Sequence, residues 1–336
     1  MTLPESTQSR EERKNMLSSF FLRGRRRGDT IFRWVVIGAA GYTLLLLGLV
    51  VFSVGEGSLA AFGKEGFFQF FAQTDWNPVE GRESYGALPY VVGTLVSAGI
   101  AMAIGVPISL GIAVFISEIA PPRVGTPVGY IVEVLAAIPS IIYGLWALFV
   151  FRFWILDFIE RPLHEAFGGS IPLFAQTPFG LDVFTAGIVL AIMIIPIISS
   201  IAREILKAVP NSQREAAYSL GATRWETVWK FVFPYAKAGL LGAAILGLGR
   251  AVGETILVTM VIGNAVGAAA IPEGLFDQSQ TLSSVIANEF NEAVTNFHIS
   301  SLIALAVVLF IITMAINVGA QFLVSRMVRV VPGARE

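Results

Sequence analysis

Six long apolar stretches alternate with polar segments along the chain. They cover roughly residues 34–55, 88–117, 127–151, 183–202, 238–262 and 299–325. A helix needs about 20 residues to cross the hydrocarbon core of a bilayer, so each stretch is long enough to span a membrane. The apolar residues show no alternation of period two, and backbone groups in lipid must be hydrogen-bonded within the segment. The pattern therefore predicts an all-α integral membrane protein with six transmembrane helices.

The composition supports this prediction. Of the 336 residues, 55% are hydrophobic and 14% are charged, whereas soluble domains carry about 25% charged residues. The mean hydropathy is +0.72. There is no cysteine, which excludes disulfides and thiolate metal sites. The two histidines, His164 and His298, leave little scope for imidazole metal chemistry, so we expect no metal site and no cofactor in this chain.

The distribution of basic residues predicts the orientation. If the N-terminus is inside, 18 of the 23 Lys and Arg residues lie on the cytoplasmic side, as the positive-inside rule requires. We therefore expect both termini in the cytoplasm and a multi-pass location in the plasma (inner) membrane. The chain divides into a basic N-terminal tail (1–33), a first transmembrane helix with an outer loop (34–87), a core of five transmembrane helices (88–325) and a C-terminal tail (326–336).

The three predicted outer loops differ from the cytoplasmic ones. Residues 56–87, 152–182 and 263–298 carry thirteen acidic and four basic residues, with Phe, Trp and Gly interleaved. They are longer than minimal connections. Two interpretations stay open: a docking surface for a partner, and a solvated, loosely folded cap.

The cytoplasmic loop 209–236, "VPNSQREAAYSLGATRWETVWKFVFPYA", predicts two short helices. Two patterns of Ser or Thr followed by Glu predict capping boxes: Ser212 with Glu215, and Thr223 with Glu226. Gly221 stands between them, where a helix end favours positive φ. Pro234 is expected to close the second helix.

The faces of these two helices also suggest a contact surface. Ala216, Ala217 and Leu220 form a small, smooth patch on the first. Trp225 and Trp229 recur at helical spacing on the second, and such a pair next to a membrane is also typical of an interfacial anchor.

The order Glu215-Ala216-Ala217, then Gly221, then Pro234 resembles the EAA loop of ABC importer permeases. The family has Ile and Leu where this chain has Phe231 and Phe233. The resemblance implies a six-helix type I importer permease whose loop couples to an ATP-binding subunit, with Trp225 inside the coupling segment. No GxxxxGK[ST] motif occurs in this chain, so we expect no ATPase site here and ATP hydrolysis by a separate subunit.

Arg250 and Glu254 are the unusual charges, because they lie inside the fifth apolar stretch, "LGLGRAVGETILVT". Each costs about 2.5–3.5 kcal/mol near the centre of a membrane helix. Three hypotheses account for them. In the first, they neutralise one another, although the order Arg before Glu is the less favourable one in a continuous helix. They pair with charges on other helices, such as Glu133, or they line a transport path.

The neighbouring glycines favour a path or a close helix contact over lipid. Gly247, Gly249 and Gly253 remove side chains around Arg250, and small residues let membrane helices approach closely. On a path, the planar fork of Arg suits an oxyanion. A carboxylate beside it accepts a hydrogen bond from an anion that keeps a proton, which phosphate does at neutral pH and sulfate does not.

The segment "LGLGRAVGETILVTMVIGNA" (246–265) is similar to the fifth span of the PstC family, permease subunits of the high-affinity phosphate importer. The continuation Ile256-Leu257 favours that family over the sister PstA family, which usually continues Ala-Pro. The resemblance implies that Arg250 and Glu254 take part in phosphate passage, and Glu133 lies in a segment that also looks family-like. It further implies a PstA-like second permease subunit, two PstB-like ATP-binding subunits and an external, PstS-like phosphate-binding protein.

Two alternatives remain at this stage. A permease for sulfate or molybdate would keep the loop and the topology, and a secondary transporter would work without an ATPase. Pro107, Pro139 and Pro196 lie inside the second, third and fourth spans. They are expected either to bend these helices statically or to act as gating kinks.

Overall fold

The computed structural model describes the backbone of residues 5–327 and the side chains of residues 28–64 and 66–326. Residues 1–4 of the predicted N-terminal tail and 328–336 of the predicted C-terminal tail lie outside the described residues. The chain forms two compact units, Met1–Glu56 (unit 1) and Gly57–Glu336 (unit 2). The boundary between them falls inside the first helix, α1 (Glu5–Glu65).

Six helical segments of the described chain are long and apolar enough to cross a membrane, which confirms the predicted number. They are Gly28–Lys64, Leu88–Ile119, Ser140–Phe167, Val183–Lys207, Arg224–Val252 and Asn296–Arg326. The first belongs largely to unit 1, and the other five belong to unit 2.

Unit 2 is almost entirely helical. After α2 (Phe67–Ala72) it contains a hairpin of β1 (Trp76–Asn77) and β2 (Ser84–Tyr85), with Trp76 opposite Tyr85. The elements up to the fourth span are α3 (Leu88–Val114), η1 (Phe115–Ile119), α4 (Pro122–Ala136), α5 (Ser140–Trp146), η2 (Ala147–Phe151), α6 (Arg152–Ile155), η3 (Leu156–Glu160), α7 (Arg161–Phe167) and η4 (Pro172–Phe174). From there on they are α8 (Val183–Lys207), α9 (Asn211–Ser219), α10 (Arg224–Thr227), η5 (Val228–Val232), α11 (Phe233–Val252), α12 (Ile256–Val261), η6 (Gly267–Ala270), α13 (Leu282–Glu289) and α14 (Asn296–Met327). The turns η1, η2, η3 and η5 are π-helical.

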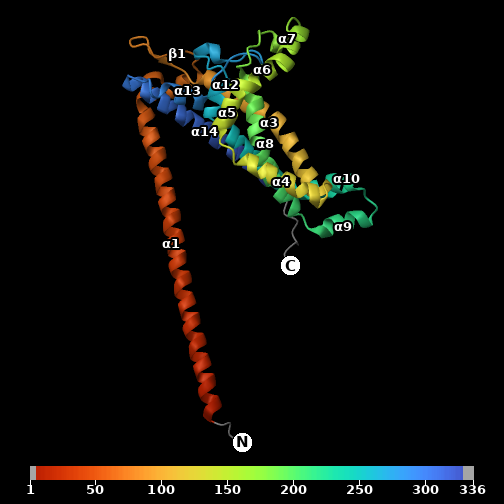
Figure 1. Ribbon diagram of the computed structural model, residues 1–336. Coiled ribbons are helices and arrows are strands. Elements are labelled where there is room, and N and C mark those ends of the chain that lie inside the picture. The colour runs from red at the N-terminus through yellow and green to blue at the C-terminus, as the bar shows by residue number, and fades with distance from the viewer. Residues whose placement is uncertain (1–4, 328–336) are drawn as a thin grey trace. The chain divides into compact units, whose positions relative to one another are not determined.

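The long helices of unit 2 run between two distinct ends. Helices α9 and α10 lie at one end, which we call the loop end, and β1, α7 and α13 lie at the opposite, cap end (Figure 1). The cytoplasmic loop and the outer loops predicted from the sequence therefore occupy opposite ends of the unit.

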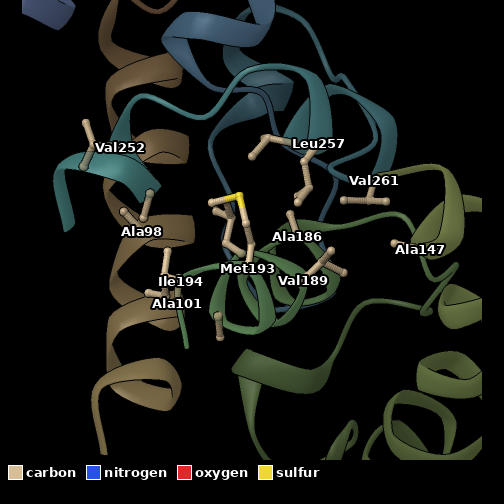
Figure 2. Packing of buried hydrophobic residues seen from close by; sticks show 14 of the residues in the cluster. Ala98, Ala101, Ala147, Ala186, Val189, Met193, Ile194, Val252, Leu257 and Val261 are labelled. Atoms are coloured by element: carbon tan, nitrogen blue, oxygen red, sulfur yellow. The ribbon is translucent and has the colours of Figure 1, made fainter. Parts of the chain in front are cut away.

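The central contact is between α3 and α8, which pack more extensively than any other pair of described elements. Small residues make this possible: a Cβ on Gly187 would clash with Ile100, and one on Gly105 would press on Ile194. Side chains of α3, α8, α11 and α12 converge on one buried hydrophobic cluster (Figure 2). Because lipid tails are as apolar as these side chains, such close packing is the main force that holds the helices together.

The predicted third span, 127–151, is displaced in the structure. Helix α4 ends at Ala136, Pro139 precedes a new helix start, and the candidate span is Ser140–Phe167. A residue before proline is disfavoured in the α conformation, so Pro139 separates two helices instead of bending one. The predicted span ends at residue 151, before Arg152, whereas the helical segment continues past this charge. Pro107 and Pro196 do lie inside continuous helices, α3 and α8.

The cap end is folded and packed, which contradicts the interpretation of a loosely folded cap. The indole of Trp76 lies against Tyr85 and Tyr90, and its Nε1 donates a hydrogen bond to Glu289 at 2.8 Å. His298 Nε2 lies 2.9 Å from the same carboxylate. Burial raises the pKa of Tyr85 to about 12, with a further contribution from nearby carboxylates, so this phenol stays neutral at physiological pH. Trp76 and Tyr85 come from one predicted outer loop and Glu289 and His298 from another, so these two loops form one structure.

The substitution Gly187→Val tests the close packing of α3 and α8. The added side chain would collide with Ile100, and overpacking of this kind costs about 1–3 kcal/mol. We expect a lower midpoint of thermal unfolding for the purified chain in detergent. The matched control is Gly99→Val on α3, because nothing lies within 4 Å of a Cβ at Gly99. Equal midpoints for the two variants would contradict the packing described here.

Candidate functional site

The fifth apolar stretch is not one continuous helix. Helix α11 ends at Val252 and α12 begins at Ile256, with Gly253, Glu254 and Thr255 between them outside any helix. The predicted uninterrupted span 238–262 is therefore wrong beyond Val252. Gly253 occupies the C-cap position of α11, in keeping with the poor helix propensity of glycine.

The break places both charges at favourable helix ends. Arg250 lies in the last turn of α11, and Glu254 lies just before the first turn of α12. A cation is stabilised at a helix C-terminus and an anion at an N-terminus. The rule that disfavours Arg before Glu applies to one continuous helix, so it does not hold across this break.

Arg250 and Glu254 also form an ion pair, as the first hypothesis supposed. The distance from Arg250 Nη2 to Glu254 Oε2 is 3.6 Å. The two side chains differ in exposure: 49% of the Arg250 side chain is accessible, but only 6% of the Glu254 side chain. The carboxylate is therefore fixed inside the unit, and the guanidinium keeps donors free for a further partner.

Two further contacts hold Glu254 in place. The backbone N–H of Leu257 donates to Glu254 Oε1 at 3.5 Å, and the hydroxyl of Ser283 donates to the Glu254 carbonyl at 2.9 Å. Ser283 belongs to α13, in the predicted outer loop 263–298. Ser283 was not predicted as a site residue, because no motif in the loop marks it.

Glu133 has a different partner from the one proposed. Its Oε1 lies 2.5 Å from Nη2 of Arg203. This ion pair joins α4 to α8. No ion pair links Glu133 to Arg250 in the described part of the chain. The suggestion that Glu133 balances Arg250 is therefore wrong, and Glu133 belongs to a second Arg–Glu pair.

The loop at the loop end contains the two predicted helices, α9 and α10. The capping box of Thr223 and Glu226 is confirmed, because each side chain accepts from the other residue's backbone N–H. Gly221 has a φ of +82°, the positive value predicted for it. The box of Ser212 and Glu215 is wrong: α9 begins at Asn211 after Pro210 and has no side-chain cap.

Other features of this loop differ from the predictions. Ala217 is buried, so the exposed face of α9 carries Glu215, Ala216 and Leu220 instead. Pro234 does not close the second helix, because α10, η5 and α11 follow one another without interruption. The π-helical turn η5 ends two residues before this proline, whose missing N–H would interrupt α-helical hydrogen bonding.

Aromatic side chains extend along the second helix of the loop. Trp225 and Trp229 are both exposed, with ring centroids 5.5 Å apart, and Trp229 stacks on Phe233 at 4.7 Å. Exposed tryptophans fit either an interfacial anchor or a partner contact.

Arg214, which was not predicted as a site residue, fastens α9 to the membrane helices. Its Nη2 and Nε donate to Glu118 of η1 at 2.6 and 3.0 Å, and its guanidinium also donates to the carbonyls of Leu206 and Val209 at 2.8 and 2.6 Å. The hydrogen bonds with Glu118 raise the pKa of Arg214 above its ordinary value. One side chain thus ties the loop to the ends of α3 and α8. The partner lies 96 residues away in sequence, so no local pattern could reveal it.

The chain is similar in sequence to membrane components of transport systems. The family model described as "Binding-protein-dependent transport system inner membrane component" matches residues 105–329. The phosphate transport system permease protein PstC of Pasteurella multocida is 47% identical over 302 residues, covering 89% of this chain and 92% of the relative. The protein of the same name from Xylella fastidiosa is 43% identical over 307 residues, covering 90% and 92%.

A solved structure shows the same fold. It is a bacterial alginate ABC transporter in complex with alginate pentasaccharide-bound periplasmic protein. One of its chains matches with a TM-score of 0.59 and 14% sequence identity, covering 88% of this chain and 96% of that chain. At this identity the likeness concerns the fold alone.

The substitution Arg214→Lys tests whether this side chain holds α9. Lysine keeps the charge but cannot reach a carboxylate and two carbonyls with one planar fork, and each lost charge-assisted bond contributes about 1.5–3 kcal/mol. We expect amide hydrogen exchange in residues 211–219 to become at least about tenfold faster. Arg224→Lys is the control, because Arg224 is exposed in the same loop. Unchanged exchange in α9 would show that Arg214 does not fasten it.

Proposed function

The chain belongs to the family of binding-protein-dependent transport system inner membrane components, and from this membership we propose that it translocates inorganic phosphate as one permease subunit of an ATP-driven importer. It is a multi-pass membrane protein with the fold of an ABC importer permease. The relatives named PstC cover nearly the whole chain at 42–47% identity, which supports phosphate over sulfate or molybdate.

The observation that carries the proposal is the Arg250–Glu254 pair at the break between α11 and α12. Arginine offers five N–H donors in a fork that matches oxyanions. About half of the Arg250 side chain is accessible, while Glu254 is held by Leu257. An oxyanion on the path would meet the guanidinium first, and a proton on that anion would be offered to a carboxylate already in position.

The proposal assigns ATP hydrolysis and solute delivery to other chains. A PstA-like permease subunit would complete the path, two PstB-like subunits would hydrolyse ATP, and a PstS-like protein would deliver phosphate from outside. The exposed residues Glu215 and Ala216 of α9, and Leu220 directly after it, are available to an ATPase subunit. Movement of α9 would reach η1 through the Arg214–Glu118 pair. Both termini are proposed to lie in the cytoplasm, with the loop end on the same side.

The first test is uptake of labelled phosphate by cells that carry the whole importer, with native chain or Arg250→Gln. Loss of the charged fork should lower uptake at least about tenfold, and Arg250→Lys should restore part of it. The control is Arg123→Gln, which removes an exposed arginine at the start of α4. Normal uptake by Arg250→Gln, with equal amounts of protein in the membrane, would make this charge structural and remove the main support for the proposal.

The second test concerns the choice of anion. Glu254→Gln removes the acceptor for a proton on the solute, so we expect the preference of uptake for phosphate over sulfate to fall. Sulfate is added in excess to the native complex and to the variant, and the inhibition of phosphate uptake is compared. Glu273→Gln, an exposed glutamate of the outer loop, is the control. An unchanged preference in Glu254→Gln would contradict the role given to this carboxylate.

A further inference from the structure

A polar cavity lies at the loop end, away from the Arg250–Glu254 pair. It has a volume of about 420 Å³ and is bounded by η1, α4 and the last turns of α8. Its polar lining residues are Ser117, Thr126, Tyr130, Glu133, Arg203 and Lys207. A neighbouring cavity, which shares Ser117 and Lys207, extends to Arg214 of α9. The cavity is therefore next to the segment that ties the loop to the bundle.

The guanidinium of Arg203 is held firmly at this cavity. Its Nη2 donates to Glu133 at 2.5 Å, and Nη2 and Nε donate to Glu204 at 2.9 and 3.2 Å. Only 12% of its side chain is accessible. It lies against Gly129 of α4, where any Cβ would collide with Nη1. Glycine at this position thus makes room for the charge.

The lining combines donors and an acceptor in the way an oxyanion with a proton requires. Arg203 and Lys207 supply positive charge, and Glu133 supplies one carboxylate. Within the described residues, the hydroxyl oxygen of Ser117 is buried and has no hydrogen-bond partner. The same pairing of a guanidinium with a carboxylate occurs at Arg250 and Glu254.

The two Arg–Glu pairs lie at different levels of the bundle. Gly239 of α11 faces Ile205 of α8, and Gly247 faces Ile198, so the two helices are antiparallel. Arg203 lies five residues beyond Ile198 toward the loop end, and Arg250 lies three residues beyond Gly247 in the opposite direction. At 1.5 Å per residue the two positions are about 12 Å apart along the helices.

We propose that this cavity is a second binding site for inorganic phosphate, on the side of the coupling helices, and this inference rests on the proposed function. Arg203 and Lys207 bind the oxygens of the anion, and Glu133 accepts a hydrogen bond from its remaining proton. Phosphate that leaves the level of Arg250 meets a similar pair of side chains before it is released. A purely structural role, in which Arg203 only joins α4 to α8, predicts no phosphate binding here.

The experiment measures equilibrium binding of labelled phosphate to the purified importer in lipid nanodiscs, without the external binding protein. The substitution Arg250→Gln removes the Arg250–Glu254 pair from the complex, and we expect the complex with this variant still to bind phosphate. Adding Arg203→Gln should weaken that remaining binding at least about tenfold. Lys207→Gln should weaken it several-fold, and because half of the Lys207 side chain is exposed, this variant tests the site without disturbing the fold.

Further variants separate phosphate binding from a structural role of Arg203. Gly129→Ala displaces the guanidinium without changing any charge, so it should also weaken binding. Glu133→Gln should reduce the advantage of phosphate over sulfate as competitor.

The possible failures are distinct. If the native importer does not take up phosphate, the proposed function fails, and this inference fails with it. If uptake is normal but Arg203→Gln and Lys207→Gln bind phosphate as tightly as their parent complex, only the second site is overturned. Equal competition by sulfate in the native complex would overturn the role given to Glu133.

Discussion

The arrangement of this protein depends on one constraint: a charge inside a membrane needs a partner supplied by the protein. Arg250 and Glu254 meet it by ending one helix and starting another between them. The interruption exposes backbone groups, and it is stable because protein covers it: α13 reaches Glu254 through Ser283, and Leu257 donates to the carboxylate. Irregular backbone at membrane depth is tolerated only where protein or a wet cavity surrounds it.

Contacts between segments that are distant in sequence also hold the two ends of unit 2. At the cap end, segments from two outer loops pack around Trp76 and Glu289, and one of these loops also supplies α13. At the loop end, Arg214 joins α9 to η1 and to the end of α8. Between them, α3 and α8 are in close contact because Gly187 and Gly105 leave space for isoleucine side chains. The loop end is thus fastened to η1, which follows α3, and to α8.

Much of this could be predicted from the sequence, because the relevant signals are local. Apolar runs fixed the number of spans, Thr223 and Glu226 lie three residues apart in one capping box, and Gly221 marks a single backbone angle. The predictions that were wrong or missing concern features that depend on distant or competing contacts. Pro139 outweighed a continuous apolar run, and Ser212 was displaced by a helix that starts at Asn211. The pairs Glu118–Arg214 and Glu133–Arg203 join residues 96 and 70 positions apart, which no window of sequence can show.

The Glu118–Arg214 pair also constrains how related sequences can diverge. Both side chains are largely inaccessible, at 8% and 16%, and removing one partner of a buried pair costs about 3–5 kcal/mol. A single replacement at either position would therefore be selected against, even if the double replacement were harmless. Lineages of this permease should exchange the two residues together or not at all. The ion pair that links the loop to the membrane helices should therefore be kept or replaced as a whole.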